Sequence, residues 1–198
     1  AATAEAERRR QQMEMDAEFE RIKAQYDVTS LPKPAVERIL ADYNQVRKRA
    51  HKSGWTAEPN GRDLSLWNIE LFDFDKDTRL AKDMEKVRAR TGKAAIQMTM
   101  KFPREYPFKP PFIRVVRPRF EFHTGRVTVG GSICTQLLTD DGWKPIYDIE
   151  SVMETVRQQI TDPDSKAAID HAKTDDYTEA EALEAFHRVA EHHKRVGW

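Results

Sequence analysis

The only cysteine of the chain is the residue with the most evident reactivity. Cys134 follows the pair Gly130-Gly131, whereas a structural cysteine usually lies within a continuous apolar run. This context favours an accessible thiol, whose thiolate would be a nucleophile. The apolar neighbours Ile133, Leu137 and Leu138 could instead cover the sulfur. One cysteine forms no intramolecular disulfide and, by itself, no zinc site, so the choice is between a working thiol and a small core residue.

A proline-rich segment is the second unusual feature. Residues 102–111 contain four prolines and three aromatic residues directly after an alternating apolar pattern. Because proline fixes φ and lacks a backbone N–H, we expect a rigid turn that leaves the sheet and re-enters it at Phe112. A polyproline ligand for a recognition domain is the rival interpretation, but the flanking strands favour a loop of the scaffold.

The charged residues balance in number but not in position. The 198 residues include 33 Lys and Arg and 33 Asp and Glu. Residues 31–52 carry six basic and two acidic side chains, residues 99–126 seven and two, and residues 139–184 four and thirteen. Zero net charge argues against a nonspecific nucleic-acid binder, and the charged blocks are either solvated faces or docking surfaces for charged protein partners.

The composition also bears on location. No apolar run approaches the roughly 18 residues that span a bilayer, and the start lacks the pattern of a secretion signal, so no membrane association is expected. A lone thiol indicates a reducing compartment, the cytoplasm or the nucleus. The chain begins with Ala1, as a piece of a longer protein would.

Two helices are predicted in the first quarter of the chain. Met15, Phe19, Ile22 and Tyr26 form one helical stripe, which predicts a helical arm over residues 1–29. A helix that packs on its own domain or frays is favoured over a dimerisation helix, because two heptads are too few for a coiled coil. After Pro32 and Pro34, residues 35–51 predict an amphipathic, basic helix that opens a domain over residues 30–198.

Strands and then helices follow. Alternating apolar residues predict antiparallel strands at Trp67–Leu71, Ile96–Phe102 and Phe112–Val116, with a long, mobile or partly helical connection over residues 75–92. Asp148 is the expected N-cap of a helix that reaches Ile160, and a capping box, Thr178 with Glu181, opens the last helix. This order indicates an α+β fold with an antiparallel sheet.

Three motifs in this order resemble the ubiquitin-conjugating enzyme family over roughly residues 34–198. The family's F-P-x-x-Y-P-F-K-P-P loop stands at Phe102–Pro111, its Gly-x-Ile-Cys active site at Gly131–Cys134, and its Trp-x-Pro loop at Trp143–Pro145. The divergent Q branch is similar in further stretches: residues 111–118, 130–134, 137–143 and 149–152, and His193 with Gly197-Trp198. The resemblance implies a four-stranded antiparallel sheet flanked by helices, here preceded by the N-terminal helical extension.

The resemblance also implies an activity. The thiolate of Cys134 would attack the thioester that joins ubiquitin, or a ubiquitin-like modifier, to its activating enzyme, and the modifier would pass to a substrate or a ligase. No cofactor is implied. A metal site is not expected either, because His192 and His193 are adjacent and point to different faces of a helix.

One departure from the family concerns the oxyanion. Ordinary members carry His-Pro-Asn ten residues before the cysteine. In them this Asn is thought to hold the active-site loop or to stabilise the oxyanion that forms when lysine attacks. Here the stretch reads His123-Thr124-Gly125, with His123 eleven residues before Cys134, and the Asn is absent, as in the Q branch. Backbone N–H groups near Gly130 and Gly131 are candidate replacements.

Six further residues are candidates around the thiol: His193, His123, Trp198, Asp140, Asp141 and Asp148. The histidines and aspartates could orient or deprotonate the attacking amine. Each also has a non-catalytic interpretation. The aspartates could be ordinary surface carboxylates, and His193 could interact favourably with the dipole at a helix C-terminus. His123 could hold the backbone of its loop, and Trp198 could anchor the end of the chain.

By the same resemblance, three surfaces would contact partners, namely ubiquitin, the activating enzyme and a ligase. They are the basic helix with Arg38, Arg47 and Lys48, the loop tip at Phe108, and the loop with Trp143, Pro145 and Ile146. Ordinary members have a small residue where Ile146 stands, so this chain departs from the family at the surface that would bind a ligase. Two rivals stay open: an inert variant of the fold that only binds ubiquitin or a ligase, and an interaction domain in which Cys134 lies in the core.

Overall fold

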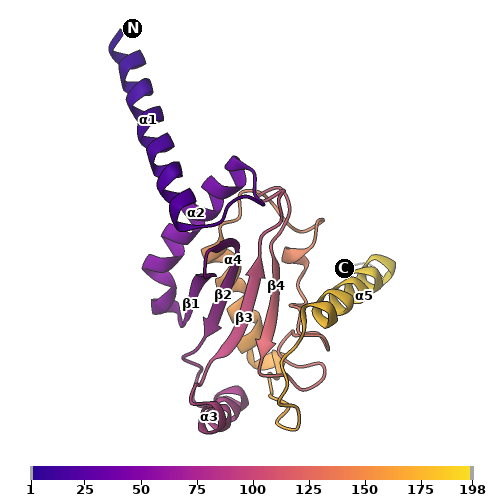
Figure 1. Ribbon diagram of the computed structural model, residues 1–198. Coiled ribbons are helices and arrows are strands. Elements are labelled where there is room, and N and C mark those ends of the chain that lie inside the picture. The colour runs from indigo at the N-terminus through magenta and orange to yellow at the C-terminus, as the bar shows by residue number, and fades with distance from the viewer. Residues whose placement is uncertain (1, 197–198) are drawn as a thin grey trace.

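The computed structural model describes the backbone of residues 2–196, and the side chains there except at positions 2–4, 15 and 18. Its centre is a four-stranded antiparallel sheet in the order β1-β2-β3-β4 (Figure 1). The strands are β1 (Trp55–Asn60), β2 (Asp63–Leu71), β3 (Ile96–Lys101) and β4 (Phe112–Arg117). Each strand pairs with the next one in the chain, and Met98 lies opposite both Ile69 and Val115. The predicted α+β architecture is confirmed.

One face of the sheet is apolar and buried. The inward side chains of β2 and β3 are fully or almost fully buried, and they are Trp67, Ile69 and Leu71 with Ile96, Met98 and Met100. Helices α2 (Lys33–Arg49) and α4 (Ile149–Thr161) contribute the apolar residues that complete this core, including Val36, Ile39, Val152 and Val156. The alternation seen in the sequence therefore marks the side of the sheet that the helices cover.

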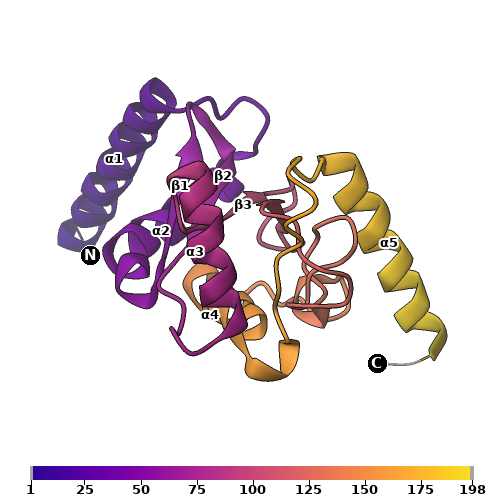
Figure 2. The same cartoon turned by 90° about the horizontal axis from the view of Figure 1, so that it is seen from below.

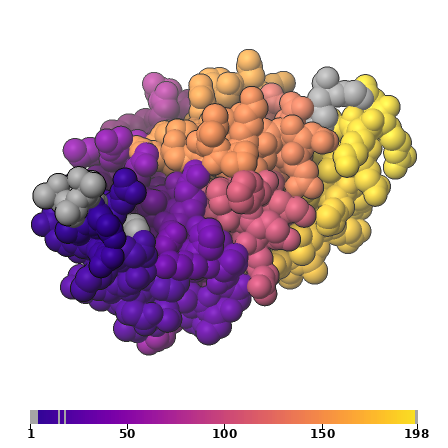
Figure 3. All heavy atoms as spheres, turned by 90° about the horizontal axis from the view of Figure 1, so that it is seen from above, coloured from indigo at the N-terminus to yellow at the C-terminus, as the bar shows by residue number. Residues whose placement is uncertain are grey.

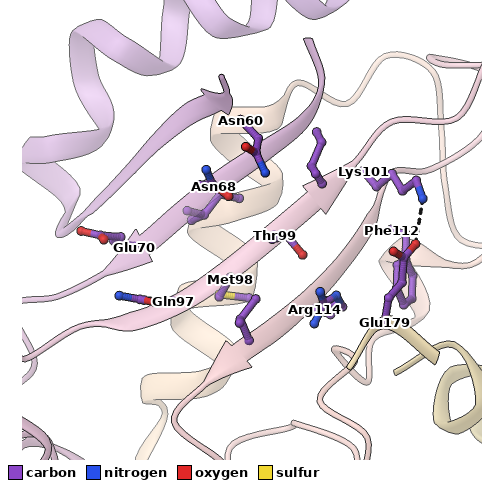
Figure 4. A pocket seen from close by; sticks show the side chains of 13 residues that line it. Asn60, Asn68, Glu70, Gln97, Met98, Thr99, Lys101, Phe112, Arg114 and Glu179 are labelled. Carbon is purple, nitrogen blue, oxygen red and sulfur yellow. Dashed lines mark hydrogen bonds and ion pairs between the residues drawn. The ribbon is translucent and has the colours of Figure 1, made fainter. Parts of the chain in front are cut away.

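The other face of the sheet is polar. Asn68, Glu70, Gln97, Thr99 and Arg114 line a shallow hollow of about 440 Å³ on it (Figure 4). Lys101 at its rim forms an ion pair of 2.8 Å with Glu179, the first residue of α5 (Glu179–Val196). A half-buried sheet of this kind is typical of antiparallel pairing.

Helix α1 (Ala2–Gln25) projects from the body of the molecule (Figure 1). Its last turns, with Phe19, Ile22 and the following Tyr26, pack half-buried against the core. Lys33 at the start of α2 lies 5.2 Å from the centre of the Phe19 ring and 3.2 Å from the Asp16 carboxylate. The predicted helical arm is thus present and packs on its own domain at its C-terminal end, whereas the side chain of Met15 lies outside the described residues. The domain boundary after residue 29 stays a prediction.

The connection between β2 and β3 contains helix α3 (Arg79–Thr91), so the partly helical alternative is confirmed. The Thr78 side chain caps its first turn, and Gly92, with φ of 81°, ends it. Buried Asp83 ties α3 to the segment after α4, because its carboxylate accepts the Ile169 N–H at 3.1 Å and lies 3.0 Å from His171 Nε2.

The two predicted helix starts in the C-terminal half are confirmed. Asp148 Oδ1 accepts the Ser151 N–H at 2.8 Å at the start of α4. Thr178 and Glu181 form the reciprocal capping box of α5, with hydrogen bonds of 3.1 and 2.7 Å.

The described part of the chain also contains short 3-10 helices: η1 (Ala50–Ser53), η2 (Gln136–Leu138) and η3 (Pro163–Ser165). Helices α1 and α5 lie at opposite ends of the molecule (Figures 2 and 3).

An aromatic series joins the core to the loops beyond β3. Tyr43, Trp67, Phe102, Tyr106, Trp143 and Tyr147 follow one another with ring centres 4.8–6.2 Å apart. Trp143 Nε1 donates a 2.7 Å hydrogen bond to the Pro107 carbonyl, which ties the tryptophan loop to the proline-rich loop. The proline-rich segment is the predicted scaffold loop between β3 and β4, rather than a free polyproline ligand.

Candidate active site

A short hairpin holds Cys134 beside the edge of the sheet. Val127 and Ile133 form an antiparallel bridge, and the Cys134 N–H donates to the Arg126 carbonyl at 2.9 Å. The hairpin is attached to β4, because the Val115 N–H donates to the Gly131 carbonyl at 2.7 Å. The backbone that leads to the thiol is therefore fixed.

The Gly-Gly turn of this hairpin lies against α5. A Cβ atom on Gly130 would lie 2.1 Å from the Glu181 carbonyl oxygen, and one on Gly131 would lie 2.6 Å from the Tyr177 ring. Gly131 has φ of 93°, and its N–H donates to the Thr128 carbonyl at 2.9 Å. The glycines thus permit close packing of the turn, and the Gly131 N–H, considered from the sequence as an oxyanion donor, is already used within the turn.

Cys134 is half-buried and lines an open groove of about 620 Å³. The segment 122–129 forms one wall of the groove, and α5 forms the other with residues that include Arg188, Val189 and His193. Phe122 and Val129 on the first wall are 71% and 56% exposed, which is unusual for large apolar side chains. An extended peptide could lie between these walls and reach the thiol.

Two of the predicted histidines lie in this groove. His123, in a left-handed backbone conformation with φ of 61°, is exposed on the first wall, and its ring centre lies 3.9 Å from that of Phe122. His193 is half-buried on the α5 wall, 70 residues further along the chain. The fold therefore brings both histidines to the same groove as Cys134.

The predicted aspartates lie elsewhere. Asp140 and Asp141 line a separate pocket together with Phe186 and His187 on a different face of α5. Asp148 accepts hydrogen bonds from the backbone and hydroxyl of Ser151 as the cap of α4. None of the three is among the residues that line the Cys134 groove. Trp198 lies outside the described residues.

Two opposed effects act on the thiol. Burial raises the pKa of Cys134 above its usual value, and the guanidinium of Arg126 partly opposes this and lowers the pKa. The neutral thiol therefore predominates at neutral pH, and formation of the thiolate depends on its surroundings. Among the described residues, no group of three or more His, Cys, Asp and Glu side chains is arranged to hold a metal ion.

Sequence reasoning missed several residues of the groove, namely Phe122, Arg126, Val129, Asp164 and Arg188. A signal for Arg126 was present, because a two-stranded hairpin turning at the glycine pair places it opposite Cys134. No comparable signal exists for Arg188 or Asp164, since only the packing of α5 and η3 brings them to the groove.

The predicted partner-binding residues divide into two groups. Arg38 donates to Asp42 Oδ2, to the Pro145 carbonyl and to the Tyr147 carbonyl at 3.0, 2.8 and 2.6 Å, so it anchors the tryptophan loop. Trp143 is buried by the proline-rich loop. The others are exposed: Arg47, Lys48 and Pro145, with Phe108 at 77% and Ile146 at 82%. Arg38 and Trp143 thus shape the surface that Phe108 and Ile146 present.

Comparison with known proteins identifies the family. A family model described as ubiquitin-conjugating enzyme matches residues 92–193. A mouse relative, named as a ubiquitin-conjugating enzyme of the Q-like type (Q-like protein 1), is 34% identical over 69% of this chain and 81% of its own length. The chain belongs to the ubiquitin-conjugating enzyme family. This assignment confirms the resemblance found in the sequence.

Other family members bear on the branch and the fold. The Drosophila melanogaster Q-like ubiquitin-conjugating enzyme protein CG4502 is 32% identical over 81% of this chain, and human ubiquitin-conjugating enzyme E2 Q1 is 29% identical over 83%. These names confirm the similarity to the Q branch. The chain spans only 51% and 39% of these two relatives. A crystal structure of an E2 from Plasmodium falciparum shares the fold, with a TM-score of 0.52 and 21% identity over 71% of this chain and 90% of that one.

No helix in the described part of the chain is both long enough and apolar enough to cross a membrane.

Proposed function

We propose that this chain is a ubiquitin-conjugating enzyme that carries ubiquitin, or a ubiquitin-like modifier, as a thioester on Cys134. The observation that carries the proposal is the position of the only thiol, half-exposed in an open groove of a chain from this family. The rival with Cys134 in the core is disfavoured by the same observation, because a core thiol would not line a groove. The inert variant is distinguished by experiment.

Loading is a thioester exchange. The Cys134 thiol loses its proton, and its sulfur attacks the carbonyl carbon of the thioester between the modifier and the activating enzyme. The new C–S bond forms as the bond to the activating-enzyme sulfur breaks, and that sulfur leaves as a thiolate. The ATP that made the first thioester is consumed by the activating enzyme. Phe122 and Val129 would hold the C-terminal segment of the modifier in the groove.

Transfer reverses the role of Cys134. An amine attacks the thioester carbonyl, a C–N bond forms, the C–S bond breaks, and the Cys134 sulfur leaves as a thiolate. The attacking amine must lose a proton, and His193 and His123 are the two imidazoles of the groove that were already candidates for this role. We assign the proton transfer to one or both of them. Transfer to a ligase thiol would be a second exchange that needs no amine.

The test of Cys134 is a charging assay. The protein is incubated with ubiquitin, activating enzyme and ATP and run on a nonreducing gel with and without dithiothreitol. We expect a band heavier by one ubiquitin that thiol removes and that Cys134→Ala lacks. Cys134→Ser should form a band that survives dithiothreitol, because an oxyester replaces the thioester. Absence of any band for a folded wild-type protein that alkylates at Cys134 would contradict ubiquitin loading and point to another modifier or a missing partner. Absence of both the band and the alkylation would favour a binding module.

The histidines are tested in a second, separate step. Charged protein is isolated, and its discharge onto free lysine is followed in a single turnover. We expect His193→Gln or His123→Gln to slow discharge about 10- to 100-fold at pH 7.5 with unchanged loading. His187→Gln, on the face of α5 away from the groove, is the matched control and should discharge normally. Equal discharge by all three variants would remove the histidines from the mechanism.

The exposed loop residues suit partner binding. Phe108 and Ile146 are apolar and exposed on two loops that the Trp143–Pro107 hydrogen bond ties together. We assign this pair, with Pro145, to a ligase, and the exposed Arg47 and Lys48 of α2 to an acidic surface of the activating enzyme.

Phe108→Ala should leave charging intact and abolish stimulation of discharge by a cognate ligase. Arg47→Glu with Lys48→Glu should instead slow the charging step itself.

A further inference from the structure

Arg126 and Cys134 lie directly opposite each other in the hairpin. The bridge between Val127 and Ile133, with the hydrogen bond from the Cys134 N–H to the Arg126 carbonyl, sets this register. This pairing brings the backbones of the two residues together at the open end of the hairpin. Both side chains line the groove.

The Arg126 guanidinium is not engaged elsewhere in the described structure. Its side chain forms no hydrogen bond or ion pair with the described residues, whereas Arg119 pairs with Asp175 and Glu181, and Arg188 with Glu184. Arg126 also adopts a left-handed backbone conformation with φ of 57°, which is costly for a residue with a Cβ atom. An unpaired cation is therefore held next to the thiol by a backbone conformation that glycine would adopt more easily.

Other charged or titratable groups line the same groove. They are His123 from the first wall, Asp164 from η3, and Arg188, His192 and His193 from α5. Within the described residues, Arg126 is nevertheless the charged group that acts on the pKa of the Cys134 thiol, and it lowers the pKa against the larger effect of burial.

We propose that Arg126 stabilises the thiolate of Cys134. Its value for ubiquitin transfer rests on the function proposed above, in which Cys134 is a thiolate twice: as the nucleophile during loading and as the leaving group during discharge. In both steps the negative charge on sulfur forms beside the guanidinium, and no bond to Arg126 is made or broken. Arg126 thus supplies a local positive charge that the apolar parts of the groove do not.

The direct test measures the reactivity of the thiol without ubiquitin. The full chain is alkylated with iodoacetamide from pH 6 to pH 10, and the rate at Cys134 is followed by mass spectrometry. We expect Arg126→Gln to move the midpoint of the profile to higher pH and to slow alkylation at pH 7.4 about 3- to 10-fold. Arg126→Lys should retain most of the wild-type rate, because it keeps the charge. Arg90→Gln, an exposed arginine of α3, is the control for net charge and should behave as wild type.

A second measurement needs no substitution. Raising the ionic strength from about 50 mM to about 1 M screens the guanidinium, so the wild-type midpoint should rise towards that of Arg126→Gln. A folded Arg126→Gln with an unchanged profile, or a wild-type profile insensitive to salt, would overturn the proposal. If the profile shifts as expected while no ubiquitin thioester forms, the ubiquitin loading proposed above fails and the role of Arg126 stands.

Discussion

At the scale of single residues, Asp42 shows how a buried charge can join two parts of the fold. Its side chain on α2 is 4% exposed and accepts hydrogen bonds from the Tyr106 hydroxyl at 2.6 Å and from Arg38 Nε at 3.0 Å. Burial raises the pKa of Asp42, and both hydrogen bonds partly oppose that rise. The folded pKa lies above the unfolded one, so this group destabilises the fold progressively as pH rises from about 4 through the raised value.

Tyr106→Phe should therefore destabilise the protein in a pH-dependent manner. It removes a donor that favours the charged carboxylate, so the pKa of Asp42 rises further. We expect a loss of about 1–3 kcal/mol in unfolding free energy at pH 7 and a smaller loss near pH 4, where the carboxyl group is more protonated. Urea unfolding at the two pH values measures this. Tyr147→Phe is the matched control, and an equal loss for Tyr106→Phe at both pH values would contradict the argument.

A glycine provides the second prediction at this scale. Gly130→Ala places a methyl group where the Glu181 carbonyl oxygen lies 2.1 Å away, so the hairpin turn or the start of α5 must move. We expect a loss of about 1–3 kcal/mol in stability and altered alkylation of Cys134. Gly130 is not among the glycines with a positive φ, so its loss of stability comes from the clash, whereas Gly61→Ala, with φ of 59° and open space around it, shows the cost of backbone strain without a clash. A Gly130→Ala protein as stable as wild type would show that α5 is not held tightly against the turn.

At the scale of elements, α3 depends on Asp83. The pKa of this carboxyl is lowered: burial tends to raise it, but His171, the Ile169 N–H and Lys86 together outweigh burial. The folded pKa lies below the unfolded one, so the contribution to stability is present above about pH 4 and is lost as pH falls through the lower folded value.

Asp83→Asn should weaken the attachment of α3. We expect a loss of about 1–2 kcal/mol at pH 6, a smaller difference from wild type at pH 3, and faster hydrogen exchange in α3 and around Ile169. Glu85→Gln changes an exposed carboxylate that lies 3.8 Å from Arg88, so it should cost less than about 0.5 kcal/mol. Unchanged exchange in α3 would mean that its apolar contacts alone hold it.

At the scale of the whole molecule, α1 lies at the opposite end from α5, the helix that forms one wall of the Cys134 groove (Figures 2 and 3). Among the described side chains of α1, those of its C-terminal half contact the body: Phe19 and Ile22 pack on it with Tyr26 beyond the helix, and Asp16 pairs with Lys33. Most helical stability in proteins comes from tertiary packing, so the outer turns, which project from the body, should be the least stable part of the helix.

Phe19→Ser with Ile22→Ser should release the arm and leave the groove unchanged. We expect amide exchange across residues 5–25 to become uniformly fast, with the melting temperature of the remaining domain shifted by less than about 3 °C. Arg8→Ser on the exposed part of the helix is the control. Sedimentation at increasing concentration distinguishes the alternative: an assembly present in wild type and lost in the double variant would show that the stripe joins two chains.

The sequence predicted those features of the fold that depend on residues close together in the chain. The alternation in β2 and β3, the cap at Asp148 and the box at Thr178 each depend on nearby residues, and each is confirmed. Strand β1 was not singled out, because its Trp55–Asn60 segment alternates weakly and contains a proline. His193 lines the Cys134 groove and Asp140 lines a separate pocket because of how α5 packs, which no local pattern encodes.

The aromatic series from Tyr43 to Tyr147 has an optical consequence. Trp67 in the core and Trp143 under the exposed loops are linked by Phe102 and Tyr106, with successive ring centres 4.9, 4.8 and 6.2 Å apart. Chromophores held rigidly at such separations couple their electronic transitions and transfer excitation energy. The near-ultraviolet circular dichroism and the indole emission of the unlabelled protein should therefore change when a partner displaces the loops that carry Phe108 and Ile146.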